Sequence, residues 1–172
     1  ASLYERIAAR AQDEHPQVRL EAVCALRNVA TPESVAAALQ VLDRPMDEFL
    51  DFALWQTCRE QKEVWLPSVL AEKSESRLYE TPTHLEFALR AVDEPAIVPA
   101  LVRLLNDGRL PADRREGVLE LVARLGAPQD LAMIFRRILE SQNQDADAQL
   151  SLLNALASAA TTRNVRPAGD LS

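Results

Sequence analysis

The segments 32-PESVAAALQVL-42, 63-EVWLPSVLAEK-73, 95-PAIVPALVRLL-105 and 128-PQDLAMIFRRI-138 lie on top of one another when the chain is slid by 31 to 33 residues. A weaker fifth copy begins at Ala1. Positions three, six, seven and ten residues after each start are apolar in every copy except at Lys73, which is the spacing of one helix face. A fixed period of this length predicts a solenoid, in which each unit buries its apolar face against its neighbours. The four columns are Val35, Leu66, Val98 and Leu131; Ala38, Val69, Leu101 and Ile134; Leu39, Leu70, Val102 and Phe135; and Leu42, Lys73, Leu105 and Ile138.

Composition and charge limit the classes of function. The 172 residues are 48% hydrophobic and 26% charged, and no apolar run approaches the length of a membrane span, so we expect a soluble protein without membrane insertion. The net charge is -7, which disfavours nucleic acid as a partner because an acidic surface repels phosphates. The pairs Arg114-Arg115 and Arg136-Arg137 are the only candidates for a basic stripe, and solvated helix flanks explain them better.

The residue types that carry chemistry are sparse. Cys24 and Cys58 each lie among apolar residues and are interpreted as small buried side chains rather than reactive thiols. His15 and His84 are 69 residues apart, and neither has a His, Cys or carboxylate four residues after it. The four glycines are scattered, so no phosphate loop is present. We therefore expect no catalytic residue, no metal site and no cofactor in this chain, and we do not expect it to be an enzyme.

A second amphipathic stretch lies between successive repeats, so each unit is predicted to be a pair of helices, one outer and one inner. Asp13 is a possible cap of the first inner helix, and Thr31 is the expected cap of the second outer helix. Pro67 and Pro99 are placed in the first turns of their helices, where a missing N–H costs little. Residues 74–80 are predicted to form a loop. Helices are expected at residues 16–29, 32–43, 46–61, 63–73, 112–125, 128–140 and 145–160, with two more opening at Thr81-Pro82 and at Pro95.

The inner helix at residues 46–61 carries the largest side chains. Asp47, Asp51, Trp55 and Arg59 recur every four residues on a face that combines acids with an exposed-looking aromatic, a composition that binding hot spots favour. With Arg19 and Arg27 of the preceding inner helix beside it, this face is the predicted partner-binding surface. The alternative is that Trp55 packs on a neighbouring repeat and the acids are merely solvated. The predicted buried stripe of the same helix is Met46, Phe49, Leu50, Ala53, Leu54, Thr57 and Cys58.

The period, the short proline-bounded links and the segments 15-HPQVRLEAV-23 and 112-ADRREGVL-119 resemble HEAT repeats. The resemblance covers roughly residues 1–160. It implies an all-α, right-handed, armadillo-like α-solenoid of about five helix pairs that start near residues 1, 32, 63, 95 and 128. Residues 161–172 would then be a tail or the start of a missing segment. Because HEAT arrays serve as scaffolds, adaptors and parts of enzymes, the resemblance implies a fold rather than a function.

A narrower resemblance runs from Ala11 to Val69. The strings 15-HPQVRLEAV-23 and 38-ALQVLDRPMDEFLDFAL-54, followed by Arg59 and 65-WLP-67, look like the HEAT segment of large secreted proteins of planctomycetes and verrucomicrobia. In that group the segment joins an N-terminal dehydrogenase-like propeller to a c-type cytochrome with a Cys-x-x-Cys-His haem motif. This chain contains no such motif. The resemblance implies a spacer and docking segment.

Three functions are compatible with these observations. The first is a protein-interaction module that holds a peptide or a neighbouring domain on its concave face and has no chemistry of its own. The second is the connecting HEAT domain of a periplasmic redox protein whose catalytic and haem parts lie outside this chain. The third is a HEAT-like enzyme, either of the DNA glycosylase type, which the acidic charge disfavours, or of the phycobilin lyase type, which only the expected fold supports. The expected location is periplasmic if the narrower resemblance holds and cytoplasmic otherwise, and the oligomeric state stays open.

Overall fold

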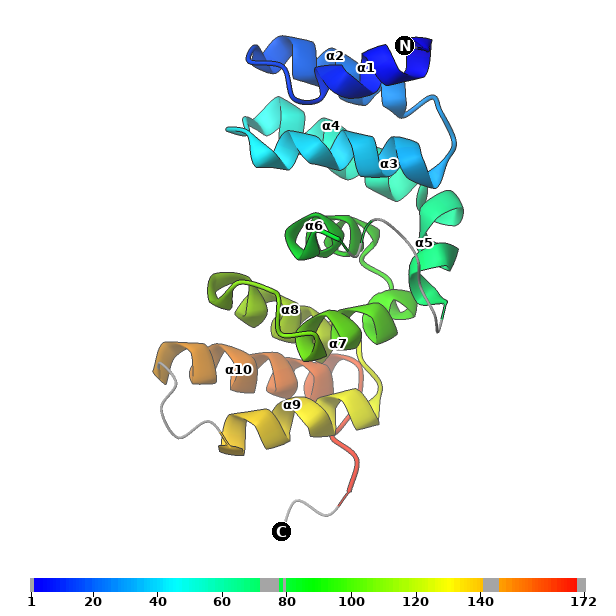
Figure 1. Ribbon diagram of the computed structural model, residues 1–172. Helices are drawn as coiled ribbons and strands as arrows, with labels where there is room; N and C mark the ends of the chain where they lie inside the picture. Colours follow the sequence, from blue (N-terminus) through cyan, green and yellow to red (C-terminus); the bar gives the residue numbers. More distant parts are fainter. Residues whose placement is uncertain (1, 72–77, 79, 141–145, 170–172) are drawn as a thin grey trace. The chain divides into compact units, whose positions relative to one another are not determined.

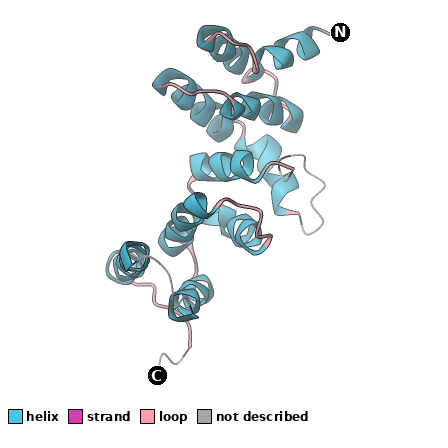
Figure 2. Ribbon diagram, turned by 60° about the vertical axis from the view of Figure 1, so that its left-hand side comes forward, coloured by secondary structure: helices cyan, strands magenta, loops and turns pink. Residues whose placement is uncertain are grey.

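The computed structural model describes residues 2–71, 78, 80–140 and 146–169, and within these residues the chain is all-α (Figure 1). Helices are connected by turns and loops, and the described residues contain no β-strand (Figure 2). The all-α prediction is confirmed. The chain divides into two compact units, Ala1–Val92 and Asp93–Ser172.

Unit 1 is built around helix α4. This helix packs against α2 on one side and α6 on the other, while α3 packs against α1, α2 and α4 (Figure 1). Gln61 ends α4 and directly precedes α5, so these two helices are joined without a loop. The elements of unit 1 are α1 Leu3–Arg10, α2 Pro16–Leu26, α3 Pro32–Leu39, the 3-10 helix η1 Gln40–Asp43, α4 Glu48–Glu60, α5 Lys62–Leu70 and α6 Pro82–Val92.

Unit 2 is built around helix α8, which packs against α7, α9 and α10. The predicted bounds of α8 and α9 are confirmed at both ends, while α10 continues two residues beyond the predicted end at Ala160. Gly108, with a φ of 69°, follows α7 and supplies the left-handed stop expected there. The elements of unit 2 are the 3-10 helix η3 Pro95–Ile97, α7 Val98–Asn106, α8 Ala112–Leu125, α9 Pro128–Glu140 and α10 Ala146–Thr162.

The repeated columns supply much of the core of both units. All eight residues at the third and sixth positions after the repeat starts are buried, whereas Leu39 is the only residue at the seventh position that is fully buried. Lys73 and most of the predicted loop at residues 74–80 lie outside the described residues. Burial of Leu, Ile and Val side chains stabilises a fold by about 1.5–3 kcal/mol each, so these columns hold each unit together. The eight residues are Val35, Leu66, Val98, Leu131, Ala38, Val69, Leu101 and Ile134.

Local signals at the helix starts have mixed outcomes. The Thr31 hydroxyl accepts a hydrogen bond from Ser34 N at 3.2 Å, so the predicted cap of α3 is confirmed. Asp13 is not the cap of α2, because His15 occupies that position and no side chain caps it. The Asp13 carboxylate instead accepts from His15 N at 3.1 Å, and this bond, together with Arg10, lowers the pKa of Asp13.

Two further expectations were wrong. Pro67 lies inside α5 rather than in its first turn, because the helix begins at Lys62, directly after Gln61. Phe49 is not part of the buried stripe of α4: it is 66% exposed, since it lies at the edge of the apolar arc defined by Leu50 and Ala53. Pro99 does lie in the first turn of α7.

No helix in the described segments combines the length and the apolar character that crossing a bilayer requires.

Candidate interaction site on helix α4

Helix α4 is oriented by its cap and its buried stripe. Asp47 precedes the helix, and its Oδ1 accepts hydrogen bonds from Phe49 N at 3.0 Å and Leu50 N at 2.8 Å. This satisfies two of the backbone donors that a helix start leaves free. The side chains that face the core are Leu50, Ala53, Leu54, Thr57 and Cys58.

Three aromatic side chains are exposed on the other side of α4. Phe49 is 66% exposed, Phe52 62% and Trp55 38%, and no other aromatic side chain in the described parts of the chain is exposed. The rings of Phe52 and Trp55 are stacked, with centroids 6.2 Å apart and planes at 20°. The Arg59 guanidinium also lies over Trp55, with its Cζ 5.2 Å from the centroid of the Trp55 ring. The Trp55 indole thus contacts the Phe52 ring and the Arg59 guanidinium, both from its own helix, and we call these side chains the aromatic row.

Acidic side chains flank the aromatic row at the N-terminal end of α4. Asp47, Glu48 and Asp51 are all exposed, and the described residues place no basic side chain in an ion pair with any of them. We refer to the exposed surface formed by Asp47, Glu48, Phe49, Asp51, Phe52, Trp55 and Arg59 as the α4 face.

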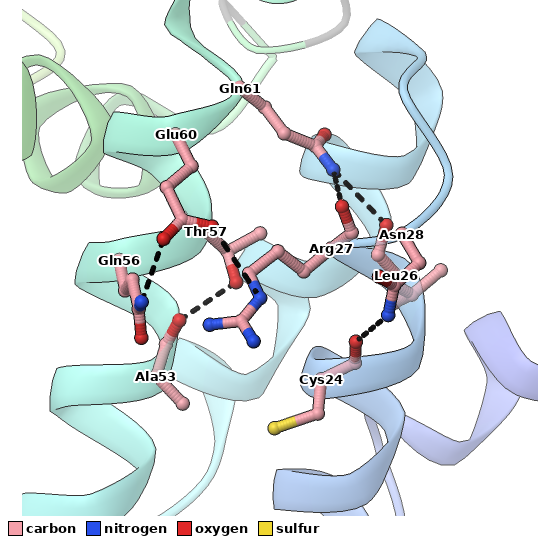
Figure 3. A network of polar contacts seen from close by, with 9 residues as sticks. All are labelled: Cys24, Leu26, Arg27, Asn28, Ala53, Gln56, Thr57, Glu60 and Gln61. Carbon is pink, nitrogen blue, oxygen red and sulfur yellow. Dashed lines mark hydrogen bonds and ion pairs between the residues drawn. The ribbon is translucent and has the colours of Figure 1, made fainter.

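A polar network joins α4 to α2 beside this face (Figure 3). The Arg27 side chain extends from the end of α2 toward α4, and its Nε lies 3.6 Å from Oε2 of Glu60. The other carboxylate oxygen of Glu60, Oε1, accepts a hydrogen bond from Gln56 Nε2 at 2.7 Å. Gln61 Nε2 donates to the carbonyl oxygens of Leu26, at 3.3 Å, and of Arg27. Arg27 therefore lies at the border of the α4 face and is engaged in packing α2 on α4.

Arg19 is buried and binds backbone carbonyl oxygens inside unit 1. It is only 3% exposed, and its Nη1 donates to the carbonyl oxygens of Asp13 at 2.9 Å and Glu14 at 3.0 Å. Its Nη2 donates to Pro45 O at 2.6 Å, so the guanidinium holds together the two loops that precede α2 and α4. An arginine buried in this way does not belong to an exposed binding surface, so the prediction that included Arg19 is corrected here.

The structure thus brings together four of the six predicted binding residues on one exposed face: Asp47, Asp51, Trp55 and Arg59. Trp55 is 38% exposed and stacks on Phe52 of its own helix, while the acids are solvated, as the alternative of packing on a neighbouring repeat also expects. The sequence analysis missed Phe49 and Phe52. Phe52 could have been found, because it lies three residues before Trp55 and therefore on the same side of the helix.

A pocket of unit 1 lies between α1, α3 and the start of α6. It is a cavity of about 680 Å³, and its polar lining includes Tyr4, Gln12, Glu33, Asp43, Glu80 and His84. His84 is buried, and its Nε2 lies 2.9 Å from Asp43 Oδ1, a pairing between residues 41 positions apart. The pair links η1 to α6, and it stabilises the packing of unit 1.

The remaining reactive residue types are separated from one another. Cys58 is fully buried, and this burial raises the pKa of its thiol, while Cys24 is half-buried on α2. Among the residues that the structure describes, no three His, Cys, Asp or Glu side chains form a group that could hold a metal ion.

Comparison of the chain with protein-family models, with curated proteins and with solved structures finds no match.

Proposed function

We propose that this chain is a right-handed α-solenoid of about five HEAT-like helix pairs, and that it binds a protein partner through the α4 face on its concave side. In this proposal the chain has no chemistry of its own. The partner is a peptide segment or a neighbouring domain.

The solenoid part of the proposal is supported by local features that recur at repeat spacing. Arg19 is the fourth residue of α2 and Arg115 the fourth of α8, and both donate to carbonyl oxygens of the loop before their own helix. Arg115 binds Leu110 O at 2.8 Å and Gly108 O at 3.1 Å. An arginine at the same helix position that binds the preceding loop in both units is what a repeated helix pair predicts.

The observation that carries the binding proposal is the cluster of exposed aromatic side chains on one helix. Single exposed apolar residues are common on protein surfaces, but Phe49, Phe52 and Trp55 lie within seven residues of one another and share a surface. Aromatic and arginine side chains contribute most strongly to protein interfaces. Here Trp55 is already ordered by Phe52 and Arg59, which lowers the entropy that binding would otherwise cost.

The test is a selection of random dodecapeptides displayed on phage against the immobilised whole chain. Three versions are compared: the unaltered protein, Phe52→Ala with Trp55→Ala, and Leu150→Ser with Leu153→Ser. The last pair removes exposed apolar side chains from α10 and is the matched control. We expect peptides selected on the unaltered protein to bind the α10 variant equally and the α4 variant at least about tenfold more weakly, as loss of interface aromatics does. Selected peptides that bind the α4 variant as well as the unaltered protein would refute the proposal.

A further inference from the structure

We propose that the α4 face takes a short basic segment, with an apolar residue that packs on the Phe52–Trp55 pair and Lys or Arg side chains that lie against the carboxylates beside it. This inference rests on the proposed function and names the chemistry of the partner.

The N-terminal end of the α4 face carries only negative charges. Asp47, Glu48 and Asp51 lie within five residues, are exposed and have no basic partner among the described side chains. Acids in a first turn are favoured by the helix dipole, which explains why they are tolerated at this position. They nevertheless leave a negative surface next to the aromatic row, and complementary charge is what steers a partner to such a surface. The acidic balance of the whole chain, at -7, acts in the same direction.

The only base of the α4 face gives the site a direction. Arg59 lies at the opposite end from the acids and covers the Trp55 ring. A basic side chain of the partner would be repelled there, whereas a basic side chain over Asp47, Glu48 or Asp51 would be attracted. The partner's bases are therefore expected on one side of its apolar residue only.

The dimensions of the face limit the length of the segment. Asp47 and Arg59 are twelve residues apart along α4, and a rise of about 1.5 Å per residue gives a surface about 18 Å long. An extended peptide covers about 3.3 Å per residue, so a segment of about six residues spans the face. A short linear motif is sufficient as the partner.

The test uses the dodecapeptide pools selected on the unaltered whole chain and a second selection on Glu48→Lys with Asp51→Lys. The matched control is Asp113→Lys with Glu116→Lys, which makes the same change in net charge on α8. We expect the pool that depends on Phe52 and Trp55 to be enriched in Lys and Arg on one side of an apolar residue. These peptides should bind the α4 charge variant about tenfold more weakly, because two attractive contacts become repulsive, and the α8 variant unchanged.

The outcomes separate this inference from the function on which it rests. A pool that depends on Trp55 but is neutral or acidic would overturn the inference and leave the interaction function standing. The inference would also be overturned if basic peptides bound the α4 charge variant as tightly as the unaltered protein. If no selected peptide depends on Phe52 and Trp55, the proposed function fails and the inference with it.

Discussion

Helices α4 and α8 have the same place in their units and very different surfaces. Helix α4 packs against α2, α3, α5 and α6, and helix α8 packs against α7, α9 and α10. Each buries a stripe of mostly apolar side chains. The exposed side of α4 and its cap carry three aromatic rings and three acids, for which the described residues supply no basic ion-pair partner. The exposed side of α8 carries Asp113, Arg114, Arg115, Gly117 and Arg124.

The charges of α8 serve the unit itself. Arg115 binds the loop before α8, and Arg124 forms an ion pair with Asp93, 31 residues earlier in the chain. On α4 the Phe52 ring stacks on Trp55, the Arg59 guanidinium lies over Trp55, and Asp47 caps the helix. The comparison indicates that packing within a unit leaves the exposed side of its helices free to differ, and the proposed function uses the exposed side of α4.

The first prediction compares the buried cores of the two units by their contribution to the free energy of unfolding. Leu54→Ala in α4 and Leu101→Ala in the repeated column of α7 should each lower the free energy of unfolding by about 2–5 kcal/mol, because both side chains are fully buried. Leu150→Ala, at an exposed position of α10, should change it by less than about 0.5 kcal/mol. Urea unfolding followed by circular dichroism measures all three. A Leu101→Ala protein as stable as the unaltered one would show that the column is not the core.

The second prediction concerns the two equivalent arginines. Arg19→Ala should cost about 2–4 kcal/mol, because it leaves three backbone carbonyls of two loops without a charged donor. Arg115→Ala should cost no more than about 1 kcal/mol, since its side chain is exposed and water can replace it at both carbonyls. Equal costs in urea unfolding would contradict the structural role assigned to Arg19.

The third prediction uses two glycines of unit 2. Gly117 is on the exposed side of α8, and a Cβ there would have no heavy atom within 4 Å, so Gly117→Ala should stabilise the protein by about 1 kcal/mol. At Gly126 a Cβ would lie 2.5 Å from Val122 O and 2.8 Å from Asp130 Cβ, so Gly126→Ala should destabilise it by about 1–3 kcal/mol. Thermal unfolding checks both signs. A stabilising Gly126→Ala would show that the turn after α8 is not closely packed.

A small effect on stability is expected from changes on the α4 face. Phe52→Ala with Trp55→Ala should lower the free energy of unfolding by only about 1 kcal/mol, the contribution of a stacked pair and a cation–π contact at an exposed site. Circular dichroism during thermal unfolding measures it. A loss comparable with that of Leu54→Ala would mean that the aromatic row is part of the core and that α4 and α8 do not differ in kind.

The sequence predicted the helices well because its local signals agree with its period. Thr31, the prolines at helix starts and Gly126 mark helix ends, with Pro67 inside α5 as the exception, and the apolar spacing assigns the buried face. Arg19 was misjudged because its position depends on contacts between distant segments. It is buried because three carbonyls from two loops converge on it.

The sequence predicted only part of the proposed binding face. The four-residue spacing identified Trp55 and its acids, but Phe49 lies at the edge of the apolar arc, where periodicity does not separate buried from exposed positions. The exposed fraction of such a residue is decided by how closely α2 packs beside α4, and this packing cannot be inferred from one helix alone.

The two tryptophans of the chain allow a direct test of the α4 face, because Trp55 is exposed while Trp65 is fully buried and donates its Nε1–H to Cys58 O at 2.8 Å. The protein is labelled with 5-fluorotryptophan, Trp55→Phe assigns the two fluorine resonances, and a selected dodecapeptide is titrated in. If α4 is the binding face, the Trp55 resonance will shift or broaden in proportion to the bound fraction while that of Trp65 stays in place. Saturation binding that leaves the Trp55 resonance unmoved would contradict the assignment of this face.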